Sequence, residues 1–315
     1  MRIWRTLAFV ILGLCFIAGI VLRARGESGP RSGDWTIRKS DEVGKIEFAL
    51  IEHHRGGNSN SESDWPTNAF QGVDFSKPGR QDVNFTIVRD AGKLDCEGVL
   101  KDGEGAGIFH FTPNPDYAKQ MSSLGFPVDE EKQYSMAVQD VSLSFAKEMK
   151  GEHLTSLDTD KLIAFRIFRV NREFIQDIRS AELNISDSVK LVAFRIHGVS
   201  PQMIRTLHQN GYNPDEDTLI AMRIHGATPE WVEELKKRGY EHVDLEKLIA
   251  FRIHGVSPEF IEKLQGLGYQ HPDPEQLVAM RIHGVTPEYI ANLRSRGIQH
   301  PTIDELVSMR IHGID

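Results

Sequence analysis

Apolar residues in the C-terminal two-thirds of the chain follow two alternating patterns, both with the period of a helix. The first pattern, DLEKLIAFRIHG in residues 244–255, is apolar on nearly all sides. The second, SPEFIEKLQGLG in residues 257–268, confines its apolar residues to one stripe. We therefore predict a helical hairpin, in which the first helix is inner and sandwiched between its neighbours and the second is outer and amphipathic.

This hairpin recurs along the chain. A hexapeptide of the form Arg-Ile-His-Gly-(Val/Ala/Ile)-(Ser/Thr/Asp) begins at residues 195, 223, 252, 281 and 310, in steps of 28, 29, 29 and 29 residues. A fixed period of this length predicts a repeat array, because so small a unit cannot bury its apolar face alone and must stack on its neighbours.

Cap residues set the predicted ends of each helix. Caps of the first helices are predicted at Asp158, Asp187, Asp215, Asp244, Asp273 and Thr302. Thr302 with Glu305 matches a capping box. Second helices begin at a Ser or Thr cap followed by Pro, and both helices stop at Gly.

Tracing the second-helix caps backward extends the array. They fall at residues 114, 142, 171, 200, 228, 257 and 286. We therefore predict seven units that fill the chain from about residue 114 to its end. The copy at residues 164–172 is irregular, since Phe168 and Arg169 replace His and Gly and Arg172 replaces Pro.

The period changes from helical to two between Trp35 and Phe111. Apolar residues alternate in 46–50, 83–87, 94–96 and 109–111, with turn clusters at 90–92 and 101–105, which predicts antiparallel strands. Residues 55–81 are polar and Gly-rich and are predicted to be a long loop. The predicted fold class is α+β: an N-terminal transmembrane or signal helix (1–25), a linker (26–33), a small antiparallel β-meander domain (34–112) and an array of α-hairpin repeats, or α-solenoid (113–315).

Residues 6–22 form an uncharged, mostly apolar run of 17 residues with arginines on both sides. Such a run is a signal anchor or a signal peptide, and we favour an anchor in the cell membrane with the soluble part outside the cytoplasm. The alternative is export after cleavage near Gly26. Cys15 lies in the run, so Cys96 stands alone in the soluble part and no intramolecular disulfide is expected there.

Charge argues against nucleic acid as a partner. The formal net charge is −8, and acidic residues recur in every repeat. No nucleophile–base, paired-carboxylate or nucleotide-binding pattern stands out, so we predict a protein that is not an enzyme and needs no cofactor.

The chain resembles a family of bacterial membrane proteins, frequent in acidobacteria, in which a β-domain with the pattern F-x-I-x-R-D-A-G…E-G…G-x-G-x-F-x-F precedes repeats close to L-I-A-x-R-I-H-G-V-T-P-E-Y-I-x-x-L. The first pattern is matched from Phe85 to Gly92, at Glu97 and Gly98, and from Gly105 to Phe111. Many such relatives carry a BlaR-type sensor-transducer metallopeptidase domain, which would imply antirepressor signalling. This chain has one apolar segment and no His-Glu-x-x-His, so the resemblance extends at most to the sensor-side ectodomain.

Two rows of basic residues in the repeats are candidate binding residues for a ligand or partner. They are Arg195, His197, Arg223, His225, Arg252, His254, Arg281, His283, Arg310 and His312. Equivalent atoms in stacked helices lie roughly 10 Å apart, which excludes one shared metal site. We favour structural roles: each His bonds the carbonyls that end its helix, and each Arg, together with Arg166, pairs with a cap Asp or first-turn Glu of the neighbouring unit.

Two weaker candidates lie in the β-domain. Glu52, His53 and His54 follow a strand and could ligate a metal, but no third ligand spacing accompanies them, which favours a solvated strand end. Gly103, Gly105 and Gly107 resemble a phosphate loop superficially; they lack the following helix and lysine and are interpreted as hairpin glycines.

Repeats without a catalytic constellation favour a protein that mediates protein–protein interaction through an unidentified protein partner. One alternative is an extracytoplasmic sensor whose β-domain binds a ligand. A second is a hydrolase with an unrecognised site.

Overall fold

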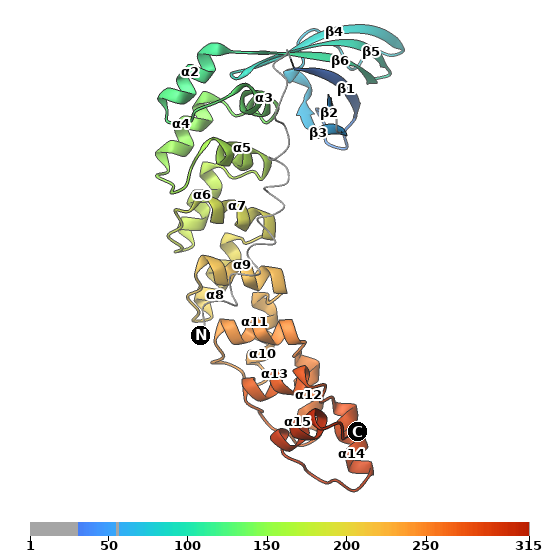
Figure 1. The fold of residues 1–315 in the computed structure, drawn as a ribbon, viewed down its shortest axis with the longest axis vertical. Helices are drawn as coiled ribbons and strands as arrows, with labels where there is room; N and C mark the ends of the chain where they lie inside the picture. Colours follow the sequence, from blue (N-terminus) through green and yellow to red (C-terminus); the bar gives the residue numbers. More distant parts are fainter. Residues whose placement is uncertain (1–30, 55–56, 315) are drawn as a thin grey trace. The chain divides into compact units, whose positions relative to one another are not determined.

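The computed structural model describes residues 31–54 and 57–314. Of these, residues 31–54, 57–88 and 92–113 make one compact unit, the β unit, and residues 89–91 together with 114–314 make a second, the helical unit. Over the described residues the fold is a sheet of six strands followed by 14 helices, which confirms the α+β class (Figure 1).

The β unit is one antiparallel sheet. Its strands are β1 (Ser32–Lys39), β2 (Lys45–His54), β3 (Gly57–Pro66), β4 (Arg80–Arg89), β5 (Gly92–Lys101) and β6 (Glu104–Pro113). Their order across the sheet is β3-β2-β1-β6-β5-β4. A simple meander would pair only consecutive strands, whereas here β1 pairs with β6 along Ser32–Ile37. The predicted meander is therefore wrong in this respect: two three-stranded meanders meet at β1 and β6.

Two predicted boundaries in this unit were wrong. Residues 57–66 were expected to lie in a loop, but they form β3 and pair with the whole of β2. Most of β3 is exposed and polar, so it has no apolar alternation that sequence reasoning could detect. In addition, β1 begins at Ser32, inside the predicted linker.

Aromatic side chains fill the core of the β unit. Phe48 makes edge contacts with Trp65 and Phe70, at ring-centre distances of 5.4 and 5.2 Å. The ring centre of Phe85 in β4 lies 5.2 Å from that of Trp35 in β1, although β6 and β5 lie between these two strands in the sheet. A backbone bridge between Gln71 and Thr86 joins the segment after β3 to β4. The two edges of the sheet thus curl toward each other around the rings.

Two glycines make room for Trp35, which is fully buried. A Cβ atom added at Gly98 or Gly107 would lie 2.6 or 2.7 Å from the indole ring. The indole Nε1 donates to the carbonyl oxygen of Glu97 at 3.2 Å. Gly105 and Gly107 therefore belong to strand β6 rather than to a hairpin turn, and only Gly103, with φ +88°, serves the turn as predicted.

The helical unit is an array of hairpins. Its first helices are α3 (Glu130–Val138), α5 (Thr159–Ile167), α7 (Ser188–His197), α9 (Glu216–His225), α11 (Leu245–His254), α13 (Pro274–Ile282) and α15 (Ile303–Ile311). Its second helices are α2 (Pro115–Ser123), α4 (Leu143–Gly151), α6 (Arg172–Ser180), α8 (Pro201–Gln209), α10 (Pro229–Lys236), α12 (Pro258–Gly266) and α14 (Pro287–Ser295). Each first helix packs against the first helix of the next unit, so they stack as rungs (Figure 1).

The predicted cap positions are confirmed, although the side chain of Asp244 makes no cap hydrogen bond. Every predicted cap position precedes a helix, and the Thr302–Glu305 capping box forms. The structure adds one cap that sequence reasoning missed, Asp129 of α3, whose side chain accepts from the backbone N–H of Lys132. In the irregular copy, Arg169 adopts φ +57°, the left-handed conformation that Gly198 has at the equivalent position.

Within the described part of the chain, no helix is long and apolar enough to cross a membrane. The predicted anchor at residues 6–22 and the cleavage position near Gly26 lie outside the described residues. Cys96 is a free, buried thiol in β5.

Candidate interaction surface

The arginines of the repeats tie each unit to the one before it. We call Arg166, Arg195, Arg223, Arg252, Arg281 and Arg310 the arginine row. Each donates to a backbone carbonyl oxygen at the end of the preceding first helix. The acceptors, in order, are those of Gln139 (3.0 Å), Arg169 (2.7 Å), His197 (2.9 Å), Gly226 (2.6 Å), His254 (3.2 Å) and Gly284 (3.2 Å).

The same guanidinium groups stack on aromatic rings of the preceding unit. Arg195 lies 3.8 Å from the ring centre of Phe174, and Arg252 lies 4.9 Å from that of Trp231. Arg166, Arg281 and Arg310 stack in the same way on Phe145, Phe260 and Tyr289. Such contacts are favourable by about 0.5–1 kcal/mol at exposed sites. At these five positions the arginine therefore contacts both a helix end and an aromatic ring of the preceding unit, whereas Arg223 contacts the helix end.

Where a glycine ends a first helix and another unit follows, that glycine has two roles. Gly255 adopts φ +73°, which a residue with a Cβ atom tolerates poorly. A Cβ atom there would also lie 2.9 Å from Nη2 of Arg281. The same approach recurs at Gly198, Gly226 and Gly284 with the next arginine of the row. Glycine thus ends the helix and leaves space for the arginine of the following unit.

The predicted inter-repeat ties exist, but their partners are different. Cap aspartates and first-turn glutamates were expected, whereas the arginines from Arg195 to Arg310 each donate to a backbone carbonyl oxygen. Unpaired carbonyls at a helix end carry partial negative charge, so a cation there satisfies both the hydrogen-bonding need and the dipole.

Second helices are tied in a similar way, which sequence reasoning missed. Lys150, Lys236 and Arg294 donate to the carbonyl oxygens of Leu124, Asn210 and Leu267, which end the preceding second helices, at 2.7, 2.9 and 2.5 Å. Tyrosines add a further set of contacts: Tyr240 donates to the Pro272 carbonyl oxygen at 2.9 Å, and Tyr269 to that of Pro301 at 2.8 Å. A Lys or Arg recurs in phase with the repeat near the end of four second helices, at Lys150, Arg179, Lys236 and Arg294, and was the available signal.

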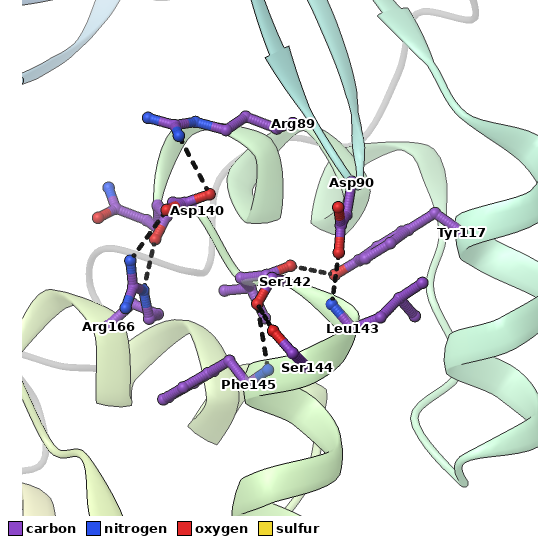
Figure 2. A network of polar contacts seen from close by, with 11 residues as sticks. Arg89, Asp90, Tyr117, Asp140, Ser142, Leu143, Ser144, Phe145 and Arg166 are labelled. Atoms are coloured by element: carbon purple, nitrogen blue, oxygen red, sulfur yellow. Dashed lines mark hydrogen bonds and ion pairs between the residues drawn. The ribbon is translucent and has the colours of Figure 1, made fainter. Parts of the chain in front are cut away.

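The first member of the arginine row, Arg166, pairs with a carboxylate at the start of the array (Figure 2). Asp140 occupies the left-handed position, with φ +53°, and pairs with Arg166 at 3.2 Å and with Arg89 at 3.4 Å. Asp90 accepts from the backbone N–H of Leu143 at 2.9 Å, at the start of α4. Arg89 and Asp90, which belong to the pattern shared with the acidobacterial proteins, therefore both contact the first hairpins through their side chains.

Each histidine of the hexapeptide was predicted to bond the carbonyl oxygens at the end of its own helix, and the histidines differ in their surroundings. His312 bonds through Nδ1 to the carbonyl oxygen of Ser308 at 2.7 Å, as expected for a last-turn residue. His197 is half-buried, and burial lowers the pKa of its imidazole below the ordinary value. His225 and His254 are also half-buried, whereas His283 and His312 are exposed.

Isoleucine is the large apolar residue of the hexapeptide that is exposed to solvent. Ile167, Ile196, Ile224, Ile253, Ile282 and Ile311 are 42–58% exposed, and we call them the isoleucine row. The first helices were predicted to be inner and sandwiched between their neighbours, and each one packs against the first helices next to it. Stacking covers two sides of a first helix and its hairpin partner a third, which leaves the isoleucine on an open face.

An acidic residue shares the open face with isoleucine on most first helices. The residue seven positions before each isoleucine, two turns away on the same side, is acidic in five of six cases: Asp160, Asp217, Glu246, Glu275 and Asp304. We call these the acidic row; Val189 takes the place in α7. Between the two rows lies a small residue, such as Ala221, Ala250 or Ala279, which is partly exposed.

Charge therefore differs between the two ends of the open face. The arginine row and the histidines mark the ends of the first helices, and the acidic row marks their starts. Some acids are shared with neighbours, as in the ion pairs of Lys132 with Asp160 (3.0 Å) and of Lys247 with Glu275 (2.5 Å).

A surface hollow of about 450 Å³ lies between α6 and the turn that follows α7. Glu173, Phe174, Asp177, Arg195 and Pro201 contribute to its lining. Burial and the charge of Arg169 lower the pKa of Arg195, while Asp177 and Glu173 oppose that shift. Arg195, whose guanidinium stacks on Phe174, thus forms part of the wall of the hollow.

The weaker candidates do not assemble a metal site. His53 bonds to Asp34 at 2.8 Å and to Asn58 at 3.0 Å, and these bonds raise its pKa. Glu52 pairs with Arg31 at 3.2 Å. Among the residues that the structure describes, no group of three or more His, Cys, Asp or Glu side chains could hold a metal ion.

Comparisons with protein-family models, with curated proteins and with solved structures found no match for this chain. The resemblance to acidobacterial membrane proteins therefore remains a prediction from the residues that carry it.

Proposed function

We propose that this protein mediates protein–protein interaction, and that the open face of its first helices is the binding surface. The isoleucine row carries this proposal. Six isoleucines of equivalent position are each about half exposed, while the leucine and aromatic residues beside them, such as Leu248 and Phe251, are fully buried. Aligned exposed apolar side chains are typical of interaction sites on soluble surfaces.

The proposal assigns the basic rows chiefly to the architecture. Each member of the arginine row already bonds a carbonyl oxygen, and most stack on a ring. A residue engaged in this way positions the helices, so that the isoleucines stay aligned. The proposal also includes tethering to a membrane through residues 6–22, as the sequence predicts, which would present the array outside the cytoplasm.

Site-specific photo-crosslinking tests the proposed function. A photo-reactive amino acid replaces Ile253 in the full chain, and the protein is expressed in the cells that naturally produce it. We expect a specific protein adduct from this position. The matched control places the same amino acid at Lys263 on the opposite, second-helix side, where we expect none. Equal adducts at both positions, or none at either, would refute the proposed surface.

A further inference from the structure

We propose that the partner of the open face is an amphipathic α-helix that lies across successive first helices, with its apolar stripe on the isoleucine row and a basic flank over the acidic row. This inference rests on the proposed function and specifies the partner. It is argued from charge, spacing and side-chain type.

Charge selects the flanks of the partner. On α9, α11 and α13 an exposed acid, Asp217, Glu246 or Glu275, lies two turns before the exposed isoleucine. Two turns of helix span about 10.5 Å, which is close to the diameter of a helix lying between the rows. Lys or Arg on the flank over the acidic row would therefore face carboxylates, and Asp or Glu on the other flank would face the ends of the first helices, where Arg and His lie.

Spacing favours a helix over an extended strand. Neighbouring packed helices lie about 8–10 Å apart, so the isoleucines recur at about that distance. Residues seven apart on a helix recur every ~10.5 Å on one face. Side chains on one face of an extended strand recur every ~6.6 Å, which would fall out of step within one repeat. Helices that bind in this way present apolar anchors at i, i+3, i+4 and i+7.

Side-chain type favours a helix over a polyproline segment. A polyproline helix repeats every ~9.3 Å and would also match the spacing. Such segments dock against aromatic rings, however. The exposed large apolar residues of the described chain are isoleucines and valines, while the rings of Trp231, Phe260 and Tyr289 lie buried under the arginine row.

Synthetic peptides test this inference against the full-length protein. The first probe is a 28-residue peptide with leucines at helical spacing, lysines on one flank and glutamates on the other. The second has the same composition with leucines at every second position. Binding is measured by fluorescence anisotropy of the labelled peptide. We expect the helical probe to bind at least tenfold more tightly than the alternating one.

Variants locate the binding. Ile224→Glu and Ile253→Glu are each expected to weaken the helical probe at least tenfold, and Ile253→Leu to leave it within threefold. Ile108→Glu is the control, because Ile108 is 42% exposed but lies on β6. The double variant Asp217→Lys, Glu246→Lys reverses the charge of two members of the acidic row and should weaken binding of the helical probe. A probe with glutamates on both flanks should then bind the double variant more tightly than it binds the wild type.

Four results would overturn the helical partner. Two concern the probes: the alternating probe binds as tightly as the helical one, or the helical probe does not bind at all. Two concern the variant: Ile253→Glu leaves binding of the helical probe unchanged, or it abolishes a self-association of the wild type, which would make a second copy of the chain the occupant. A photo-crosslinked protein at position 253 combined with any of these would leave the proposed function standing and refute only the helix. Absence of the crosslink would refute the proposed function itself.

Discussion

Nε of Arg252 donates a hydrogen bond of 2.6 Å to the carbonyl oxygen of Gly226, the residue that ends the first helix of the preceding unit. The same guanidinium stacks on Trp231 of that unit. One side chain thus bonds a carbonyl oxygen at a helix end and covers an aromatic ring, and both contacts cross the boundary between two repeats.

Arg252→Ala should therefore lower the free energy of unfolding by about 1–2 kcal/mol, since it removes a charged hydrogen bond and a cation–π contact. Urea denaturation measures the change. The exposed Lys147→Ala on α4 is the control and should stay within about 0.5 kcal/mol. Unchanged stability of Arg252→Ala, accompanied by loss of partner binding, would show that the arginine row is a binding site instead.

Gly255→Ala should destabilise the array more than Gly268→Ala. Both glycines have positive φ, +73° and +90°, so both variants bear a backbone strain of about 1–2 kcal/mol. Only at Gly255 does the added methyl group meet Arg281, at 2.9 Å, whereas nothing lies within 4 Å at Gly268. We expect an additional loss of about 1 kcal/mol for Gly255→Ala. Combination with Arg281→Ala should remove that additional loss, and a difference that persists in the double variant would argue against the contact.

Tyr240 should make stability sensitive to high pH. Burial raises the pKa of its hydroxyl from 10.0 to about 12, and the hydroxyl donates to the Pro272 carbonyl oxygen. Because the unfolded chain loses this proton first, the contribution of Tyr240 is complete below pH 10 and is lost as pH rises toward 12. Tyr240→Phe should cost about 1 kcal/mol at neutral pH and flatten the decline of Tm between pH 10 and 12. An identical decline in both proteins would contradict this assignment.

Asp140→Asn should weaken the start of the array. Asparagine tolerates the left-handed conformation, so the substitution removes charge with little change in backbone preference. Loss of the ion pairs to Arg89 and Arg166 should lower stability by about 1 kcal/mol in low salt, and less in 1 M salt. Asp116→Asn is the comparison, since Asp116 and Lys119 are both 77% exposed and their pair should contribute at most about 0.5 kcal/mol. Equal effects of the two substitutions would contradict the role of Asp140.

Sequence reasoning located helix ends well because caps are local. Asp187 and Ser200 can be recognised as caps from the residue types within one turn of them, and both cap their helices. The α+β class followed in the same way from the change of period at the end of the β unit. Even the irregular copy keeps its turn, because Arg169 adopts the conformation of the glycine it replaces.

What sequence reasoning missed depends on how units are offset in space. Ile253 belongs to an apolar helix, and no local pattern shows that its face stays open. The partner of Arg252 was expected to be a carboxylate, because the sequence does not reveal which atoms of the preceding unit lie opposite. In the β unit, the pairing of β1 with β6 joins residues more than 60 positions apart, and polar β3 carries no periodic signal.

The ties of the arginine row point in one direction along the chain. Each unit supplies an arginine to the unit before it and a carbonyl oxygen to the unit after it. Synthesis proceeds from the N-terminus, so a unit leaves the ribosome with its helix end still open, and the next 29 residues bring the side chain that closes it. The array is therefore suited to assemble in the order in which it is made, with every completed boundary formed by the most recently added unit.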